Sequence, residues 1–388
     1  KLHIMEFEEI RPYHDEELPQ IFEELIADPA FQQVACAVMP GVPFEAIAQK
    51  MRASKTKQEF QENLCYGILH KLAKDTTDGL ILESMAVLNK QSAYTYVSNH
   101  RDIILDPAIT QQVLFRNGIP MTEICVGDNL IKQSKTVEYL LRSNRMIRVI
   151  RGISARELYL SSQILSKYIR QTITSGKSSI WLAQRQGRTK DGIDTTEQGL
   201  LKMLDMSGTK SFKENFSELN IVPLSISYEY EPCDVRKARE ILISRTQKYV
   251  KTRTDMHSIV MGIRQQKGDV HLNFGLPITP DEIELASHCD KNDRYQAIRH
   301  AVDKRIIAGY QLWKTNYIAY DLVNHSYKYA ELYTPEDVEK FTEYTEHRLD
   351  KVERRLNRAE LRDIFLRIYS NPVESKERLV SGEPLRQE

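Results

Sequence analysis

Hydrophobic and polar positions fall into three successive patterns along the chain. Up to about residue 90, apolar residues recur at helical spacing over residues 16–27, 44–51 and 57–74, and chain breakers separate these segments. From about residue 94 to 280, short β-rich runs alternate with helical segments; beyond about residue 281 the strand patterns stop. We therefore expect a helical N-terminal region at residues 1–90, an α/β core at residues 91–285, and a helical C-terminal region with a disordered tail at residues 286–388.

The middle pattern predicts an α/β fold. β-branched, aromatic and other apolar residues dominate the runs 94–97, 123–126, 147–150, 179–183, 221–228 and 270–274. The clearest helix between them spans residues 154–174, where Ser154 and Glu157 form a capping box. This alternation is typical of a mixed, mostly parallel sheet with helices on both faces.

The C-terminal pattern predicts one long helix. It begins at Thr334-Pro335, a cap followed by a first-turn proline, and is expected to run to Tyr369, before Asn371-Pro372. Its many charges and single apolar seam predict an arm packed along one stripe. Residues 374–388 are expected to be disordered.

Composition narrows the classes of function. With 54 basic and 54 acidic residues the chain carries no net charge, so we expect no nucleic-acid partner. Its five cysteines are scattered and form no CxxC pair, and no cluster of histidines and cysteines has metal-ligand spacing. No apolar run reaches the roughly 18 residues of a membrane span, and the N-terminus is too acidic for a signal peptide. We expect a cytoplasmic protein, or one that is peripheral on the inner face of the membrane.

The first candidate for chemistry lies in residues 94–107, YTYVSNHRDIILDP. His100 directly follows a predicted strand, with Asp102 and Asp106 close behind. Ligands of α/β proteins bind at the carboxyl ends of strands, although a histidine in such a place more often has a structural role. The letters HRD also open the protein-kinase catalytic loop, but that loop needs an asparagine where Pro107 stands, and the sequence has no Gly-rich phosphate loop or DFG, so we do not expect a kinase.

Further polar clusters accompany the later strands. Arg145, Arg148 and Arg151-Gly152 surround one apolar run, and the turn AQRQGR follows the strand SIWLA. A further strand, IVPLSI, contains a proline. Arginines are well suited to grip phosphate groups, so a histidine beside arginine-bearing turns suggests a general base next to an anionic substrate.

With these motifs in this order, the chain resembles the glycerolipid acyltransferase superfamily, the lysophosphatidate and glycerol-3-phosphate acyltransferases. NHRDIILD is similar to the family's His/Asp block, RMIRVIRG to its arginine block, AQRQGR to its EGxR block, and IVPLSIS to its proline-containing strand. The similarity covers about residues 90–230.

The resemblance implies direct acyl transfer. His100 would act as general base on an acceptor hydroxyl, which attacks the thioester of acyl-CoA or of an acyl-carrier protein. Arg151, Gln186, Gly187 and Arg188 would hold the acceptor, expected to be a lysophospholipid such as 1-acyl-glycerol-3-phosphate, with glycerol 3-phosphate or an amino-lipid as alternatives. No metal and no cofactor beyond the acyl co-substrate is implied, and the enzyme could contact a membrane peripherally.

The spacing of the His/Asp block departs from the family pattern. Five residues separate His100 from Asp106, where the family usually has four, and Asp102 is only two positions away. We expect Asp106 to orient His100, because a loose first helical turn can absorb one extra residue. Asp102 remains the alternative.

The EGxR block departs as well, because Gln186 stands where the family normally has glutamate. Glutamine keeps the shape of glutamate but loses its charge and its capacity to accept a proton. Three explanations are open: a natural variant that works, an introduced inactivating substitution, or a relative that binds ligand without turning it over.

Overall fold

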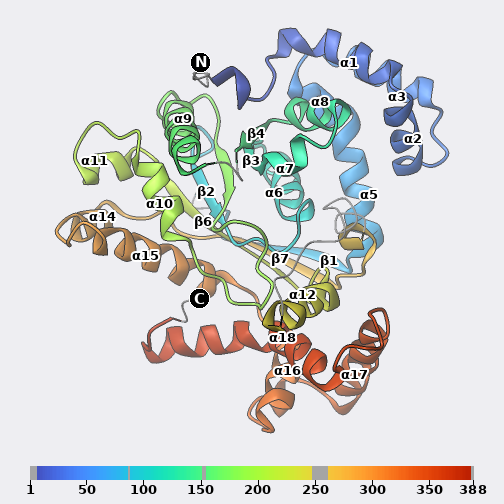
Figure 1. The fold of residues 1–388 in the computed structure, drawn as a ribbon, viewed down its shortest axis with the longest axis vertical. Helices are drawn as coiled ribbons and strands as arrows, with labels where there is room; N and C mark the ends of the chain where they lie inside the picture. Colours follow the sequence, from blue (N-terminus) through green and yellow to red (C-terminus); the bar gives the residue numbers. More distant parts are fainter. Residues whose placement is uncertain (1–6, 86–87, 151–153, 247–260, 386–388) are drawn as a thin grey trace.

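The computed structural model describes residues 7–85, 88–150, 154–246 and 261–385, and its centre is a seven-stranded sheet in the order β1-β7-β6-β2-β5-β3-β4 (Figure 1). The strands β6, β2, β5, β3 and β4 run parallel; β7 is antiparallel to β6, and β1 is parallel to β7. This confirms the predicted mixed, mostly parallel α/β fold. The strands are β1 (Gly79–Glu83), β2 (Thr95–Ser98), β3 (Glu123–Gly127), β4 (Met146–Val149), β5 (Ile180–Ala183), β6 (Ile221–Tyr228) and β7 (Asp269–Phe274).

Each predicted strand is present, and β1 is an additional one that the pattern did not predict. It follows directly on the polar run at residues 75–78, which indicates only the end of a helix. Leu80 and Leu82 pair with Val270 and Leu272 of β7. The strand character of so short a run therefore depends on a partner almost two hundred residues away in the chain.

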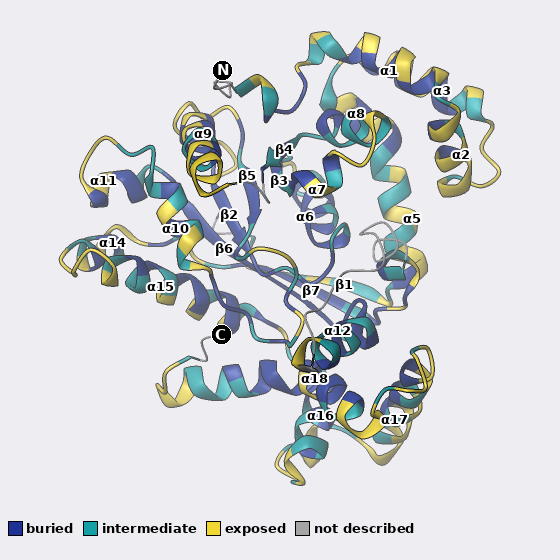
Figure 2. Cartoon of the chain, in the orientation of Figure 1, coloured by how far each residue is buried: buried dark blue, intermediate teal, exposed yellow. Residues whose placement is uncertain are grey.

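Helices cover both faces of the sheet, as the alternation predicted (Figure 1). In β5, Ile180 and Leu182 face one hydrophobic cluster while Trp181 faces the other, in keeping with the two-residue period of a strand. The strands are accordingly buried throughout much of their length (Figure 2). One face is covered by α9 (Ala155–Thr174), α10 (Gln198–Asp205), α14 (Pro280–Ser287) and α15 (Asp293–Gly309), and the other by α6 (Leu105–Arg116).

The N-terminal helices pack into a hydrophobic cluster of their own, which also includes residues of α8 (Lys135–Ser143). They comprise α1 (Leu18–Ala27), α2 (Pro29–Val38), α3 (Phe44–Ala53), α4 (Lys57–Phe60), a π-helical turn at Gln61–Cys65 and α5 (Tyr66–Thr76). In the described ranges, no helix is both long and apolar enough to cross a bilayer.

The C-terminal region differs from the prediction of one helix that ends near Tyr369. Two helices, α17 (Pro335–Leu349) and α18 (Arg358–Ser381), pack with α16 (Lys314–Asn324) and α12 (Asp234–Thr246). Pro372 lies inside α18, which continues through residues 374–381, so disorder was the wrong prediction there. Tyr369 and Val373 are fully buried on either side of the proline, and this burial offsets the lost helical hydrogen bond.

A buried carboxylate on α15 predicts that stability depends on pH. Asp303 is 4% exposed and accepts hydrogen bonds from the Thr196 amide (2.8 Å) and hydroxyl (2.6 Å). Burial raises the pKa of Asp303 to about 6. The folded protein therefore binds this proton more tightly than the unfolded chain. The resulting stabilisation is fully present below the ordinary aspartate pKa and is lost as pH rises through about 6.

We expect Asp303→Asn to remove a pH-dependent contribution of about 2 to 3 kcal/mol between pH 4 and 7. Urea unfolding of the wild type and the variant across this range would measure it, with Asp290→Asn at an exposed loop position as control. Parallel stability curves for wild type and Asp303→Asn would contradict the prediction.

Candidate active site

His100 lies just beyond the carboxyl end of β2, where the neighbouring residue fixes the exit of the chain. The Asn99 side chain forms two hydrogen bonds with the backbone of Ile226 in β6, from Nδ2 to the carbonyl (3.0 Å) and from the Ile226 amide to Oδ1 (2.8 Å). The His100 side chain is 14% exposed, and its ring lies edge-on to Trp181 of β5, with 5.8 Å between centroids. The imidazole is thus held at the edge of the sheet where ligands bind in α/β proteins.

Asp106, in the first turn of α6, is the carboxylate that contacts His100. Its Oδ2 lies 2.9 Å from His100 Nδ1 and also accepts the backbone N–H groups of Arg101 (2.6 Å) and Asp102 (2.9 Å). Its Oδ1 accepts the hydroxyl of Tyr228 in β6 at 2.7 Å. Burial, together with the charge of Asp106, raises the pKa of Tyr228 well above its usual value, so the hydroxyl stays a donor. The carboxylate is therefore fixed from several sides in a position that orients the imidazole.

Asp102, the alternative partner, has a different role. Its Oδ1 accepts the backbone N–H groups of Ile104 (2.9 Å) and Leu105 (2.8 Å) and so caps the turn that leads into α6. This turn absorbs the additional residue between His100 and Asp106. Of the two carboxylates left open by the sequence, the structure places Asp106 against the ring.

A pocket of about 640 Å³ opens beside His100 at the carboxyl ends of β2, β3 and β5. Gln186, Gly187 and Arg188 all line it, so the His/Asp block and the EGxR-like turn converge on one cavity. Gln186 is exposed, and Gly187 has a φ of +76°, a left-handed conformation that favours glycine. Arg151, which was expected to hold the acceptor, lies outside the described residues.

The lining of this pocket divides into an apolar and a charged part. The apolar part comes from β3, β5 and the start of α6, and the charged part from the turn after β5 and from facing carboxylates. Arg188 is half-buried, and its Nη1 has no hydrogen-bond partner among the described residues. The apolar lining residues include Ile103, Pro107, Ile124, Val126, Trp181 and Ala183; the charged ones are Asp128, Arg185, Arg188, Lys190, Glu197 and Glu240. Such a lining suits a ligand with both an apolar and a charged part.

Several residues at this site were not predicted from the sequence. Tyr228 ends a predicted strand, and the two-residue period does place it on the face of Leu224 and Ile226, but nothing local indicates that its hydroxyl meets Asp106. Trp181 was interpreted as part of a strand, yet it also lines the pocket. Within the part of the chain that the structure describes, no group of three or more histidine, cysteine or acidic side chains could hold a metal ion.

Comparison with known proteins gives distant relatives. Three curated proteins named glycerol-3-phosphate acyltransferase, from Pseudomonas paraeruginosa and from two strains of Pseudomonas aeruginosa, are each 22% identical to this chain over 262 residues. The alignment covers 61% of this chain and 30% of each relative, so the chain spans about 30% of the length of the relatives it matches. No protein-family model matches the chain.

Proposed function

We propose that this protein transfers a fatty acyl group from an acyl thioester to a hydroxyl of a phosphate-bearing acceptor, with 1-acyl-glycerol-3-phosphate as the expected acceptor. The observation that carries the proposal is the contact between His100 and the buried Asp106 at the mouth of a pocket that also contains Arg188. The distant relatives named glycerol-3-phosphate acyltransferase support acyl transfer as the general reaction.

The proposed mechanism assigns the base role to Nε2 of His100, because Nδ1 faces Asp106. Nε2 takes the proton of the acceptor hydroxyl while the oxygen of that hydroxyl attacks the thioester carbonyl carbon. Asp106 keeps the imidazole in one orientation and stabilises the imidazolium that forms. When the tetrahedral intermediate collapses, the carbon–sulfur bond breaks and the imidazolium returns the proton to the thiolate.

The acceptor phosphate is assigned to Arg188. A guanidinium offers paired donors to a phosphate, and Arg188 lines the same pocket as His100. The apolar lining near Trp181 would bind the acyl chain. Glycerol 3-phosphate is the second candidate acceptor, and the name that the distant relatives carry favours it.

A catalytically silent lipid- or phosphate-binding protein is the rival function, because Gln186 lines the pocket in place of the family's glutamate. The two functions predict different results for thiol release from acyl-CoA and acyl-carrier-protein donors. For an enzyme, we expect release that requires a phosphate-bearing acceptor and is much weaker with 1-acylglycerol or glycerol. Gln186→Glu is expected to raise kcat/KM by about tenfold, because a carboxylate at this exposed position could orient the nearby arginines.

Gln311→Glu, at an exposed position in the C-terminal region, is the matched control and should leave the rate unchanged. Absence of thiol release from both the wild type and Gln186→Glu, with all donors and acceptors, would contradict the proposed acyltransferase function. Phosphate-dependent binding measured by calorimetry would then support the silent protein. Free fatty acid formed without any acceptor would instead indicate a thioesterase.

A further inference from the structure

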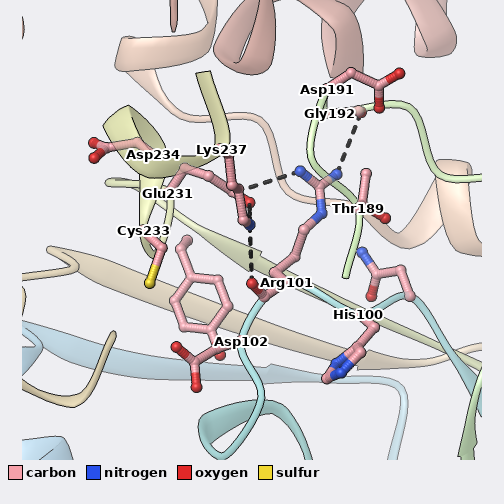
Figure 3. A network of polar contacts seen from close by, with 12 residues as sticks. His100, Arg101, Asp102, Thr189, Asp191, Gly192, Glu231, Cys233, Asp234 and Lys237 are labelled. Carbon is pink, nitrogen blue, oxygen red and sulfur yellow. Dashed lines mark hydrogen bonds and ion pairs between the residues drawn. The ribbon is translucent and has the colours of Figure 1, made fainter. Parts of the chain in front are cut away.

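The backbone that carries His100 is held by groups from distant parts of the chain. The His100 carbonyl accepts the Thr189 amide at 2.7 Å, and the Arg101 carbonyl accepts the Lys237 ammonium at 2.9 Å. Two residues before His100, the Ser98 carbonyl accepts the Gln184 amide at 2.7 Å. The loop after β5 and helix α12 thus fix the loop that presents the imidazole (Figure 3).

Arg101, the neighbour of His100 in sequence, points away from the pocket into the interior. Its side chain is 0% exposed and pairs with Asp194 (2.5 Å) and Glu231 (3.3 Å), and the guanidinium lies 5.0 Å from the centre of the Tyr310 ring. Lys237, also buried, pairs with Glu231 at 2.5 Å. These four charged side chains, Arg101, Asp194, Glu231 and Lys237, are called the buried tetrad below.

Burial of the four charged side chains of the tetrad costs desolvation free energy. Removing two cations and two anions from water costs so much that well-packed apolar residues are often at least as stable. Charged groups do differ from apolar ones in that their hydrogen bonds are directional and fix a single arrangement. Thr189 and Asn99 extend the arrangement by donating to the two oxygens of Asp194, at 2.9 and 3.0 Å. A role in positioning therefore explains the tetrad better than a role in stability.

One oxygen atom connects the tetrad to the proposed base. The Arg101 amide donates to Asp106 Oδ2, the oxygen that also lies against His100 Nδ1. A rotation of the Arg101 backbone would therefore move the imidazole. It would also move the Arg101 amide, which donates to Asp106, the carboxylate partner of the imidazole. The Arg101 side chain and the Lys237 bond to its carbonyl restrict that rotation.

The C-terminal helices hold the two carboxylates that pair with Arg101. Tyr369 of α18 accepts the Glu231 amide (3.0 Å) and donates to Asp234 (2.9 Å), which begins α12 and pairs with Arg348 of α17. Asn371 of α18 donates to the carbonyl of Asp191, in the loop that carries Asp194, at 2.7 Å. Both carboxylate-bearing segments are therefore anchored on helices more than one hundred residues away in sequence.

We propose that Arg101 is a positioning residue for His100, and that α17 and α18 complete the catalytic unit by holding its partners Glu231 and Asp194. This inference rests on the proposed role of His100 as the base. It assigns to the C-terminal helices a part in the reaction although they lie outside the pocket.

Kinetics of single variants test the proposal. Lys237→Met is expected to lower kcat per folded molecule by about tenfold to 10²-fold, because small displacements of reacting groups can cost up to about 10²-fold in rate. The KM for the acceptor is expected to change by no more than about twofold. Tyr369→Phe, which removes one hydroxyl and keeps the ring, is expected to lower kcat about threefold to tenfold with the same small change in KM. Arg101→Lys should retain more activity than Arg101→Met, because it keeps a cation beside Asp194.

Tyr295→Phe is the matched control, since its hydroxyl is bound to Asp205 instead of to the loop of His100. This control should lose stability without a change in kcat. Wild-type kcat in folded Lys237→Met and Tyr369→Phe, or a raised KM with unchanged kcat, would overturn the positioning role.

A second measurement does not depend on turnover. Nitrogen-15 spectra of histidine-labelled protein, with His100 assigned through His100→Gln, report which ring nitrogen carries the proton. We expect the Nδ1–H form in the wild type and a mixture of tautomers in Lys237→Met and Tyr369→Phe. Unchanged His100 signals in both variants would overturn the inference. If the wild type shows no acyl transfer while these signals do change, the proposed function fails and the positioning role stands.

Discussion

Replacing His100 by alanine is expected to lower kcat for acyl transfer by about 10²- to 10⁴-fold, the contribution typical of a general base. A hydroxyl is a poor nucleophile until its proton is removed in the transition state, and the proposed mechanism assigns this removal to the imidazole beside Asp106. Thiol release measured with saturating donor and acceptor would give kcat directly.

Binding of the acceptor should survive in the same variant, because the phosphate is assigned to Arg188 and not to the imidazole. Calorimetry with the acceptor alone would test this, with a dissociation constant expected within about threefold of the wild type. His288→Ala, at the residue directly after α14 and with 71% of the side chain exposed, is the control for loss of a histidine. Turnover retained in His100→Ala would remove this residue from the mechanism.

Asp106→Asn is expected to lower kcat by about 10²- to 10⁴-fold while the protein remains folded. The amide oxygen can still accept from His100, Arg101 and Asp102, and the amide nitrogen can donate to the Tyr228 oxygen. Packing is therefore preserved, but the negative charge that would stabilise the imidazolium in the proposed mechanism is lost.

Asp102→Asn tests which of the two carboxylates, Asp102 or Asp106, is the functional partner of His100, a choice that the sequence left open. Asparagine caps about as well as aspartate, so we expect this variant to lose about 1 kcal/mol or less of stability and to keep kcat within about threefold. Thermal unfolding would establish that both variants are folded before their rates are compared. A larger rate loss in Asp102→Asn than in Asp106→Asn would reverse the assignment.

Local sequence patterns were sufficient for the strands of the core because those strands are nearly continuous apolar runs. β6 is buried at every position, as a central strand of a mostly parallel sheet should be, and its pattern extends from Ile221 to Tyr228. The capping box at Ser154 likewise fixes the start of α9, since both of its hydrogen bonds are formed within one helical turn.

Local patterns failed where tertiary packing overrides local preference. Pro372 ordinarily ends a helix, but burial of Tyr369 and Val373 carries α18 on to Ser381. The break between α17 and α18 and the edge strand β1 were also missed. In each case the chain adopts a conformation that a distant partner stabilises.

By itself, the sequence determined the α/β fold, the order of the motifs and the choice of His100 as the candidate base, because each depends on residues that are neighbours in the chain. The tertiary structure decided which carboxylate meets the imidazole and that the turn at Gly187 faces the same pocket. It also revealed the burial of Arg101 between Asp194 and Glu231. These contacts join side chains up to 130 residues apart, and their hydrogen bonds depend on how the strands and helices pack, which no local periodicity encodes.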